Sequence, residues 1–408
     1  MVKDFVLPGI AAIQEEMIGL RRRIHAYPEL GFQEVATSEL VAECLSKWGY
    51  QVTRAIGKTG VVGTLKNGQG PSLGLRADMD ALPIHETTGL PHASRHEGIM
   101  HACGHDGHTA TLLAAAKYLA ETRAFSGRLN LIFQPAEEGL GGAQKMMEDG
   151  LFERFPCDAV FALHNVPGYP AGHLGFFSGA FMASADTVTV RVVGRGGHGA
   201  VPDKTIDPIV VCASIVTALQ SIVSRNVSPR DLAIISVGSI HAGVASNVIP
   251  SSAQMLLTVR ALAPDVRDLL ERRICELVHG QAASFGAQAE IDYVRCHPVL
   301  INHRTETDFA RQVAADWFGT QSMIDGLEPF TASEDFACML EQCPGSYLVI
   351  GNGDGERSCA LHHSGYDFND DCLAVGATYW VKLTERFLAK PVRTEPKQFN
   401  NDVEEKHT

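Results

Sequence analysis

The sequence predicts an α/β fold in which a larger domain, built on a mixed sheet flanked by helices, carries an inserted ferredoxin-like α+β domain. Short apolar strands alternate with helical segments along most of the 408 residues, which is typical of an α/β sheet. Between residues 185 and 295 the order becomes β-α-β-β-α-β, the order of a ferredoxin-like unit. The length also exceeds that of one ordinary hydrophobic core, so two domains are expected.

The elements of the larger domain follow from its apolar patterning. Residues 10–48 have helical spacing, and an Ala- and Leu-rich helix is predicted at 109–122. Asn67-Gly68 is predicted to form the turn of a hairpin whose second strand begins near Leu73. Further strands are predicted at residues 51–54, 60–65, 129–133, 160–163 and 347–350.

The inserted domain is predicted from strands and helices that complete one unit. Strands are predicted at residues 187–193, 232–240, 254–261 and 287–295, and helices at 207–223 and 264–285. We therefore expect a discontinuous larger domain at residues 1–184 and 296–390, with the inserted domain at 185–295. Residues 391–408 are polar and interrupted by proline, so this tail is predicted to be disordered.

Composition limits the partners and the compartment. A formal charge of −13 argues against nucleic acids and anionic membranes, which bind clustered Lys and Arg. The basic run Arg21-Arg22-Arg23 is predicted to be a solvated helix face. No apolar stretch approaches the roughly 20 residues that span a bilayer, and the N-terminus makes a poor signal peptide. The ten cysteines lack paired spacing, which favours reduced thiols and a cytoplasmic location.

The segment His101-Ala-Cys103-Gly-His105-Asp106-Gly-His108 is the first candidate site. It holds far more histidine than 17 residues among 408 would place there by chance. Thiolate and imidazole are donors suited to zinc and its neighbours in the transition series. Two alternatives are loop histidines that only cap or hydrogen-bond, and a nucleophilic Cys103.

A second group of polar residues follows predicted strands. Glu137-Glu138 comes after the strand at 129–133, and His164 ends the strand at 160–163. Asp78 and Asp80 end the strand that begins near Leu73. The carboxyl edge of an open α/β sheet is where ligands bind, so these groups are expected to converge with the histidine cluster. In a metal site one of two adjacent carboxylates can bind the ion while the other acts as general base. Each residue alone could equally be a surface carboxylate, a loop histidine or a helix cap.

The third candidate is His198, which lies in the glycine-rich segment Gly194-Arg-Gly-Gly-His198-Gly-Ala200. This segment lacks the Gly-Lys-Ser/Thr ending of a phosphate-binding loop. If domain closure brought His198 onto a metal site, it could stabilise an oxyanion. The alternative is a glycine-rich hairpin with an incidental histidine.

Together these segments resemble one family, the metal-dependent aminoacylase/carboxypeptidase peptidases, in the branch of hippurate hydrolases and plant auxin–amino-acid conjugate hydrolases. The matching stretches occur in the family's order over most of residues 20–375: RRRIHAYPELGFQE, LRADMDALP, MHACGHDGHTA, FQPAEEG, ALHNVP, GRGGHGAVPDKTIDPI, NVIP, TASEDFA and LHHSGYDFND. The resemblance implies two divalent metal ions per subunit, zinc or manganese, with cobalt or nickel as further options. It implies that their ligands are Cys103, His105, Glu138, His164 and His362.

The resemblance also implies roles for residues around the metal ions. Glu137 would be the general base and Asp80 would orient a ligand. His198 would reach the active site of the partner subunit, in a dimer formed through the inserted lid domain. Asn247 and Arg260 would bind the carbonyl or carboxylate of the substrate; a strand-end cap and a surface cation are the alternatives.

The predicted function is metal-dependent hydrolysis of the amide bond of N-acyl amino acids. Three departures from the family's pattern concern the substrate: Pro202-Asp203 where Pro-His is frequent, His363-Ser364 after the last ligand, and HAGVAS before NVIP. The second makes His363 a competitor of His362. The rival activities are those of a carboxypeptidase or dipeptidase and of an N-acetyl-diamino-acid deacetylase. A metal-binding protein without catalysis, or a structural zinc site, are alternatives of another class.

Overall fold

The computed structural model describes residues 5–355 and 358–389, so the predicted tail at 391–408 lies outside the described residues. The larger sheet has seven strands in the order β1-β2-β4-β3-β5-β15-β6. Strands β4, β3, β5 and β15 run parallel, whereas β1, β2 and β6 pair antiparallel to their neighbours. The bounds are β1 Gln51–Ile56, β2 Gly60–Asn67, β3 Ser72–Asp78, β4 Gly127–Gln134, β5 Ala159–Pro167, β6 Leu174–Gly175 and β15 Gly345–Gly353.

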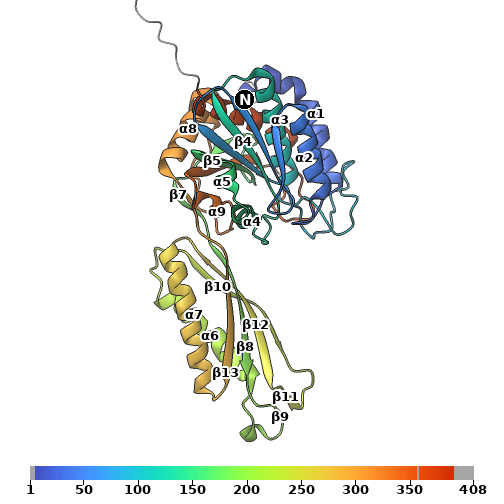
Figure 1. Cartoon of the computed structure of the whole chain (residues 1–408). Coiled ribbons are helices and arrows are strands. Elements are labelled where there is room, and N and C mark those ends of the chain that lie inside the picture. Colours follow the sequence, from blue (N-terminus) through green and yellow to red (C-terminus); the bar gives the residue numbers. More distant parts are fainter. Residues whose placement is uncertain (1–4, 356–357, 390–408) are drawn as a thin grey trace, which may run out of the picture.

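Alternating side chains of the central strands build a core on each face of this sheet. On one face, Leu131 and Phe161 pack with the helices α1, α2, α3, α8 and α10. On the other face, Ile132 and Val160 pack with the shorter α4, α5 and α9. Helices therefore flank the sheet on both sides (Figure 1). Their bounds are α1 Pro8–Ala26, α2 Val35–Lys47, α3 His105–Thr122, α4 Gly142–Glu148, α5 Leu151–Arg154, α8 Arg304–Phe318, α9 Ala337–Leu340 and α10 Asp370–Phe387.

The hairpin predicted at Asn67-Gly68 is wrong. Gly68 turns the chain with a φ of 76°, but β4 lies between β2 and β3 in the sheet. The segment after the turn passes the beginning of β4, where the Ser126 hydroxyl donates to the carbonyl of Gln69 and the Arg128 amide donates to that of Pro71. This crossing places β3 inside the sheet, parallel to β4 and buried on both faces.

The second sheet has four antiparallel strands in the order β10-β12-β8-β13. Both α6 and α7 cover one face, where the valines of β8 pack on Ile215 and Leu270. The chain order β8-α6-β10-β12-α7-β13 confirms the ferredoxin-like fold, and Figure 1 shows this unit as a separate lobe below the larger sheet. The bounds are β8 Ala185–Val193, α6 Pro208–Arg225, β10 Ala233–Ala242, β12 Ser252–Ala261, α7 Pro264–Ser284 and β13 Gln288–His297.

Two pairs of short strands remain, one packed against the larger sheet and one at the tip of the small lobe. Near the larger sheet, β7 pairs with β14, next to the two places where the chain passes between the sheets. At the opposite end, β9 pairs with β11. The bounds are β7 Gly179–Met182, β14 Leu300–Asn302, β9 Gly197–His198 and β11 Val248–Ile249, with 3-10 turns at Pro202–Lys204 and Thr320–Ser322.

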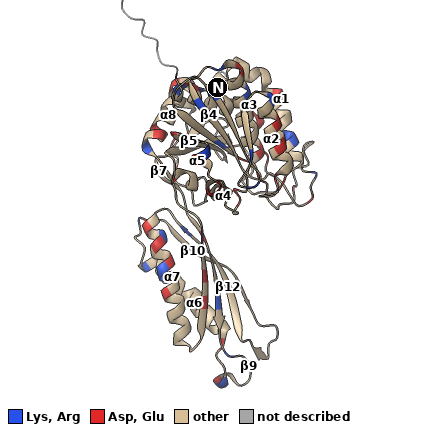
Figure 2. Cartoon of the chain, viewed as in Figure 1, with Lys and Arg blue, Asp and Glu red and all other residues tan. Residues whose placement is uncertain are grey.

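Helix α6 is the one helix among the described residues long and apolar enough to cross a membrane. Its residues Val211, Ile215, Leu219 and Ile222 are buried against the four-stranded sheet, as expected for a core helix. Arginines are interspersed with Asp and Glu along α7 (Figure 2), which is typical of a solvated helix face.

Candidate active site

The candidate ligands come from the carboxyl ends of neighbouring strands and from the turn that starts α3. Cys103 and His105 flank Gly104, which has a φ of 93°. A Cβ atom at Gly104 would lie 2.1 Å from Oδ1 of Asn165, so this turn accepts only glycine. Because the turn faces the ends of β4 and β5, both side chains meet the residues that follow these strands.

All five predicted ligands are linked by short contacts. Donor atoms of Cys103, His105 and Glu138 lie within 4.8 Å of one another. The Cys103 thiol lies 3.4 Å from Nε2 of His164, and Oε1 of Glu138 lies 3.2 Å from Nε2 of His362. The backbone amide of His362 donates to the carbonyl of Ala102, which fixes this residue beside the turn. The structure therefore brings together the residues that the sequence separates by up to 259 positions.

Backbone carbonyls fix the tautomers of two of these histidines. Nδ1 of His105 lies 2.9 Å from the carbonyl oxygen of Asp80, and Nδ1 of His164 lies 2.7 Å from that of Asn165. A carbonyl oxygen can only accept, so both Nδ1 atoms carry the proton. Each Nε2 atom then has a free lone pair, which is the form that binds a metal ion.

Two buried atoms in this cluster have no hydrogen-bond partner among the described residues. They are Nε2 of His105 and Oε1 of Glu138, whose contacts with Asp78 at 3.7 Å and His362 at 3.2 Å are ion-pair contacts and not hydrogen bonds. Buried polar atoms are rarely left without a partner, because their lost hydration is not replaced. A thiolate, imidazoles and a carboxylate form a donor set for a divalent transition metal, so the residues fit such an ion.

Asp80 holds two of the candidate ligands at once. Its Oδ2 accepts from the backbone amide of Glu138 at 2.9 Å, and its Oδ1 lies 3.2 Å from Nδ1 of His105. Asp80 therefore contacts both the ring of His105 and the backbone of Glu138.

Glu137 lies beside the cluster on a tight turn after β4. Ala136 has a φ of 51°, and its amide donates to Oε1 of the buried Glu34 at 2.8 Å. Burial raises the pKa of Glu137 well above its ordinary value, and the carboxylates of Glu334, Glu138 and Asp335 raise it further. Arg76 binds Glu334 at 2.8 Å and offsets part of this negative charge.

A cavity of about 560 Å³ opens onto these residues. Cys103, Glu137, Glu138, His164 and His362 line it from the larger sheet. Apolar side chains form another wall: Leu82, Val166, Met182, Phe330, Tyr347, Val349 and Leu361. Arg260 and His297 line the cavity from the four-stranded sheet.

His198 and Asn247 lie elsewhere in the chain. Both are exposed at the β9–β11 end, where the Gly199 amide donates to the carbonyl of Asn247 at 2.8 Å. Figure 1 shows this end as the point of the small lobe farthest from the larger sheet. One chain alone therefore does not bring these residues to the cavity.

Residues 74–386 match the model of peptidase family M20/M25/M40. The chain belongs to this family. It is 47% identical over 386 residues to hippurate hydrolase of Campylobacter jejuni, covering 94% of this chain and 99% of that enzyme. It is 39% identical to an N-acetyl-L-cysteine deacetylase of Bacillus subtilis, covering 93% and 90% of the two chains. The crystal structure of a dinuclear metal-binding peptidase of the family from Bacillus subtilis superposes with a TM-score of 0.80, at 33% identity, covering 93% and 99%.

These relatives place the M20 chain in the amidohydrolase branch and confirm that it is a hydrolase. They also confirm the fold class and support a metal-dependent amidohydrolase, in agreement with the donor cluster.

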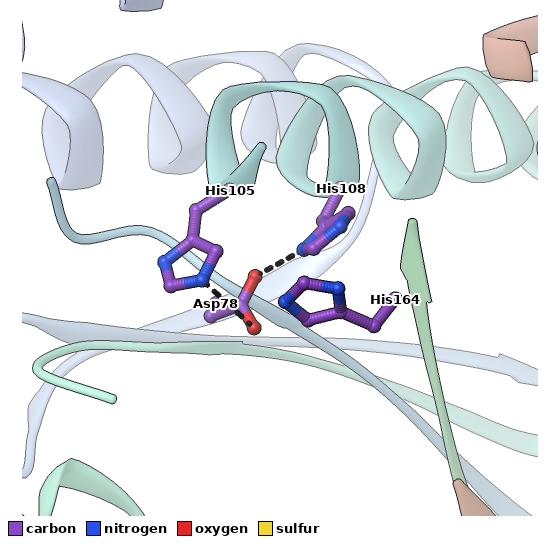
Figure 3. A group of neighbouring side chains, drawn as sticks. All are labelled: Asp78, His105, His108 and His164. Atoms are coloured by element: carbon purple, nitrogen blue, oxygen red, sulfur yellow. Dashed lines mark hydrogen bonds and ion pairs between the residues drawn. The ribbon is translucent and has the colours of Figure 1, made fainter. Parts of the chain in front are cut away.

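Asp78 and His108, which the sequence included among the candidate polar residues without a role of their own, also lie at the M20 site. Figure 3 shows His105 and His108 from α3 and His164 from β5 around the Asp78 carboxylate. Nδ1 of His108 lies 2.6 Å from Asp78 and its Nε2 lies 2.7 Å from Oδ1 of Asn165, so both ring nitrogens are occupied. His108 therefore supports the site rather than offering a free donor. The i, i+3 spacing of His105 and His108 at a helix start was the available signal.

The prediction for the basic run is wrong for its first residue. Arg22 and Arg23 are exposed, but Arg21 is fully buried and binds Asp106, Asp367 and Asp370. Burial alone would lower the pKa of the neighbouring His25, but the Asp106 carboxylate raises it to about 10. This ion-pair network anchors the first turn of α3 directly after His105.

His363 is the weaker of the two adjacent histidines as a ligand. Its side chain is exposed, and its Nδ1 accepts from the Gly365 amide at 3.0 Å. His362 is also exposed, but its Nε2 lies 3.2 Å from Oε1 of Glu138.

Proposed function

We propose that this M20 hydrolase cleaves the amide bond of N-acyl amino acids, with water activated at two divalent metal ions. The observation that carries the proposal is the convergence of Glu137 and four of the five donor residues on one cavity, with the fifth, His105, within 4.8 Å of two of them. Nε2 of His105 and Oε1 of Glu138 are also buried without a hydrogen bond among the described residues. We assign the metal-binding role to Cys103, His105, Glu138, His164 and His362, and the orienting role to Asp80. Zinc and manganese are the ions we favour, because the donors mix thiolate, imidazole and carboxylate.

The residues of the chain divide the work of hydrolysis. Bound divalent ions supply Lewis acidity, which lowers the pKa of a water molecule and polarises a carbonyl group. Glu137 accepts the proton of the attacking water as the new C–O bond forms at the acyl carbon. Glu137 then returns this proton to the amide nitrogen as the C–N bond breaks, so that a carboxylic acid and an amine leave. Burial and the neighbouring carboxylates raise the pKa of Glu137, and beside bound divalent ions this carboxylate would stay ionised, as a base requires.

The two walls of the cavity fit an amphiphilic substrate. Met182, Phe330 and Val349 provide an apolar surface for an acyl group, whereas Arg260 provides a cation for a carboxylate. A benzoyl or other apolar acyl amino acid has this distribution of chemistry. Hippurate is the substrate in the name of the relative at 47% identity.

We further propose a dimer formed through the inserted domain at 185–295, in which the partner's His198 and the partner's Asn247 complete the cavity. The support is that both residues lie together on an exposed tip, distant from the chemistry of their own chain. An imidazole N–H from the partner's His198 would stabilise the developing oxyanion. The cysteines outside α10 are free thiols, which fits the reducing cytoplasm as the compartment.

Amine release from a substrate panel tests the function. Chelated protein, with and without added Zn²⁺, Mn²⁺ or Co²⁺, would be given N-benzoylglycine, N-acetyl amino acids, N-acetyl-diamino acids and dipeptides. We expect metal-restored cleavage of the acyl amino acids. Cleavage of dipeptides alone would instead assign a dipeptidase, and cleavage of N-acetyl-diamino acids alone a deacetylase. Metal binding without any cleavage would contradict the proposal.

A further inference from the structure

Three adjacent strands of the small lobe place a row of residues at the mouth of the cavity. In β8 and β12, Asp186 pairs with Val259, so the next position along brings Ala185 opposite Arg260. In β8 and β13, Ala185 pairs with His297. The row therefore reads Arg260, Ala185, His297, and all three line the cavity. The small side chain of Ala185 leaves a gap between the two larger ones.

A β-bulge puts His297 into this row. Arg295 pairs with Asp186, so an unbroken ladder would pair Cys296 with Ala185. The register shifts between Arg295 and His297, and His297 takes that position instead. Bulges re-aim side chains beside active sites, and this one turns an imidazole onto the face that α6 and α7 leave uncovered.

The polar atoms of this row lack partners within the chain. His297 is only 4% exposed, and neither of its ring nitrogens has a hydrogen-bond partner among the described residues. Nη1 of Arg260 is also buried without a partner there. The nearby Asp186 carboxylate does not bind Arg260 or His297, because it accepts hydrogen bonds from Arg267 and Tyr293 on the helix-covered face.

The charge of the row is suited to an anion. Burial lowers the pKa of His297 to about 4, and the Arg260 cation contributes to this. At neutral pH the imidazole is therefore uncharged and has one N–H to donate beside the guanidinium group. A carboxylate can accept from both donors at once, whereas a neutral amide in its place would offer only one oxygen and no charge.

We propose that His297 is a specificity residue that, together with Arg260, binds the free α-carboxylate of the acyl amino acid over Ala185. This inference rests on the proposed function, since it names the group that a substrate of that reaction presents to the row. Binding of the carboxylate by Arg260 and His297 makes the enzyme selective for acyl amino acids with a free carboxylate over the corresponding amides.

The test compares N-benzoylglycine with N-benzoylglycinamide by benzoate release. The proteins are the metal-loaded wild type, His297→Leu, His297→Asn and the control His279→Leu, whose histidine is exposed on α7. We expect wild type and His279→Leu to prefer the free acid. His297→Leu should lose about 10- to 100-fold of that preference, mainly through KM for the acid, because a hydrogen bond to a charged group is lost. His297→Asn keeps an N–H donor, so it should retain part of the preference for the free acid over the amide.

The outcomes separate this inference from the function on which it rests. Failure of the wild type to cleave any acyl amino acid would remove the proposed function itself. An unchanged acid-to-amide preference in His297→Leu, with normal wild-type activity, would overturn only the role of His297. Thermal unfolding at pH 7.5 should show His297→Leu at least as stable as wild type, because it replaces an unpaired buried polar group. Loss of folding in both His297 variants would make the residue structural and would also overturn the inference.

Discussion

The two ends of the molecule both present histidines, but in opposite surroundings. At the carboxyl edge of the larger sheet, His105 and His164 are buried, and a backbone carbonyl sets the tautomer of each. At the β9–β11 tip, His198 is exposed, and its side chain accepts one bond from the Ala200 amide. The buried end is therefore preorganised within one chain, whereas the tip needs a second surface before it can act on a substrate.

The largest expected effect tests the preorganised end. Glu137→Gln should lower kcat by about 10²- to 10⁴-fold, because the general base is lost. Its metal content should stay at the wild-type level, measured by elemental analysis after gel filtration. Glu148→Gln, an exposed carboxylate on α4, is the matched control. Full turnover in Glu137→Gln would remove this residue as the base.

The next effect tests the tip. His198→Ala should lower kcat by about 10²- to 10³-fold through loss of an oxyanion donor, with an unchanged melting temperature because the side chain is exposed. His241→Ala, at an exposed position of β10, should retain wild-type kinetics. Unchanged kinetics of His198→Ala would confine the tip to a structural role.

Mixing two inactive variants sharpens this comparison. Subunits with His198→Ala and subunits with Glu137→Gln would be unfolded, refolded together and assayed. If the tip acts on the other subunit, mixed dimers contain one competent site, and roughly a quarter of wild-type activity should return on random pairing. Activity that stays at the level of the separate variants would show that the tip does not act across a dimer.

A smaller effect concerns the support of the metal ligands. Asp80→Asn should weaken metal affinity by about 10- to 100-fold, because the contacts that orient His105 and the Glu138 amide are altered. Competition with a chromogenic chelator measures this change. Excess metal should restore most of the turnover, in contrast to Glu137→Gln. Unaltered affinity would mean that Asp80 does not orient the ligands.

The smallest expected effect is a pH-dependent change in folding stability caused by His297, which lies at the cavity between the larger sheet and the small lobe. Its folded pKa of about 4 lies below the ordinary value near 6.5. Between these two pH values His297 is protonated in the unfolded chain but not in the folded chain. The free energy of unfolding therefore falls as the pH drops from about 6.5 towards 4. His297→Leu should lack this contribution and exceed wild type by roughly 2 kcal/mol near pH 4.5 in denaturant unfolding, with a smaller difference at pH 7.5. A constant difference over this range would contradict the pKa shift.

The sequence predicted what depends on local pattern and on the edge of the sheet. The ferredoxin-like order follows from apolar periodicity. Glu138 and His164 stood out because they follow buried strands, and Cys103 and His105 because they lie in a histidine-rich segment. The full set of five donors came from the resemblance to the family. Strand pairing was harder to predict. The chain does turn at Gly68, but which strand pairs with β2 depends on the packing of the whole sheet. Burial of Arg21 depends on Asp367 and Asp370, more than 300 positions away. His297 was not predicted because a bulge shows only in the register of β13 against β8.

The most direct test of the account is a metal titration of the chelated protein with N-benzoylglycine present. Bound metal and amine release would be followed on the same samples for wild type and Glu137→Gln. We expect turnover of the wild type to rise with bound metal and to reach its plateau at two ions per chain, while Glu137→Gln binds the same amount without releasing amine. Amine release by the fully chelated wild type, at the rate of the metal-loaded protein, would contradict the account.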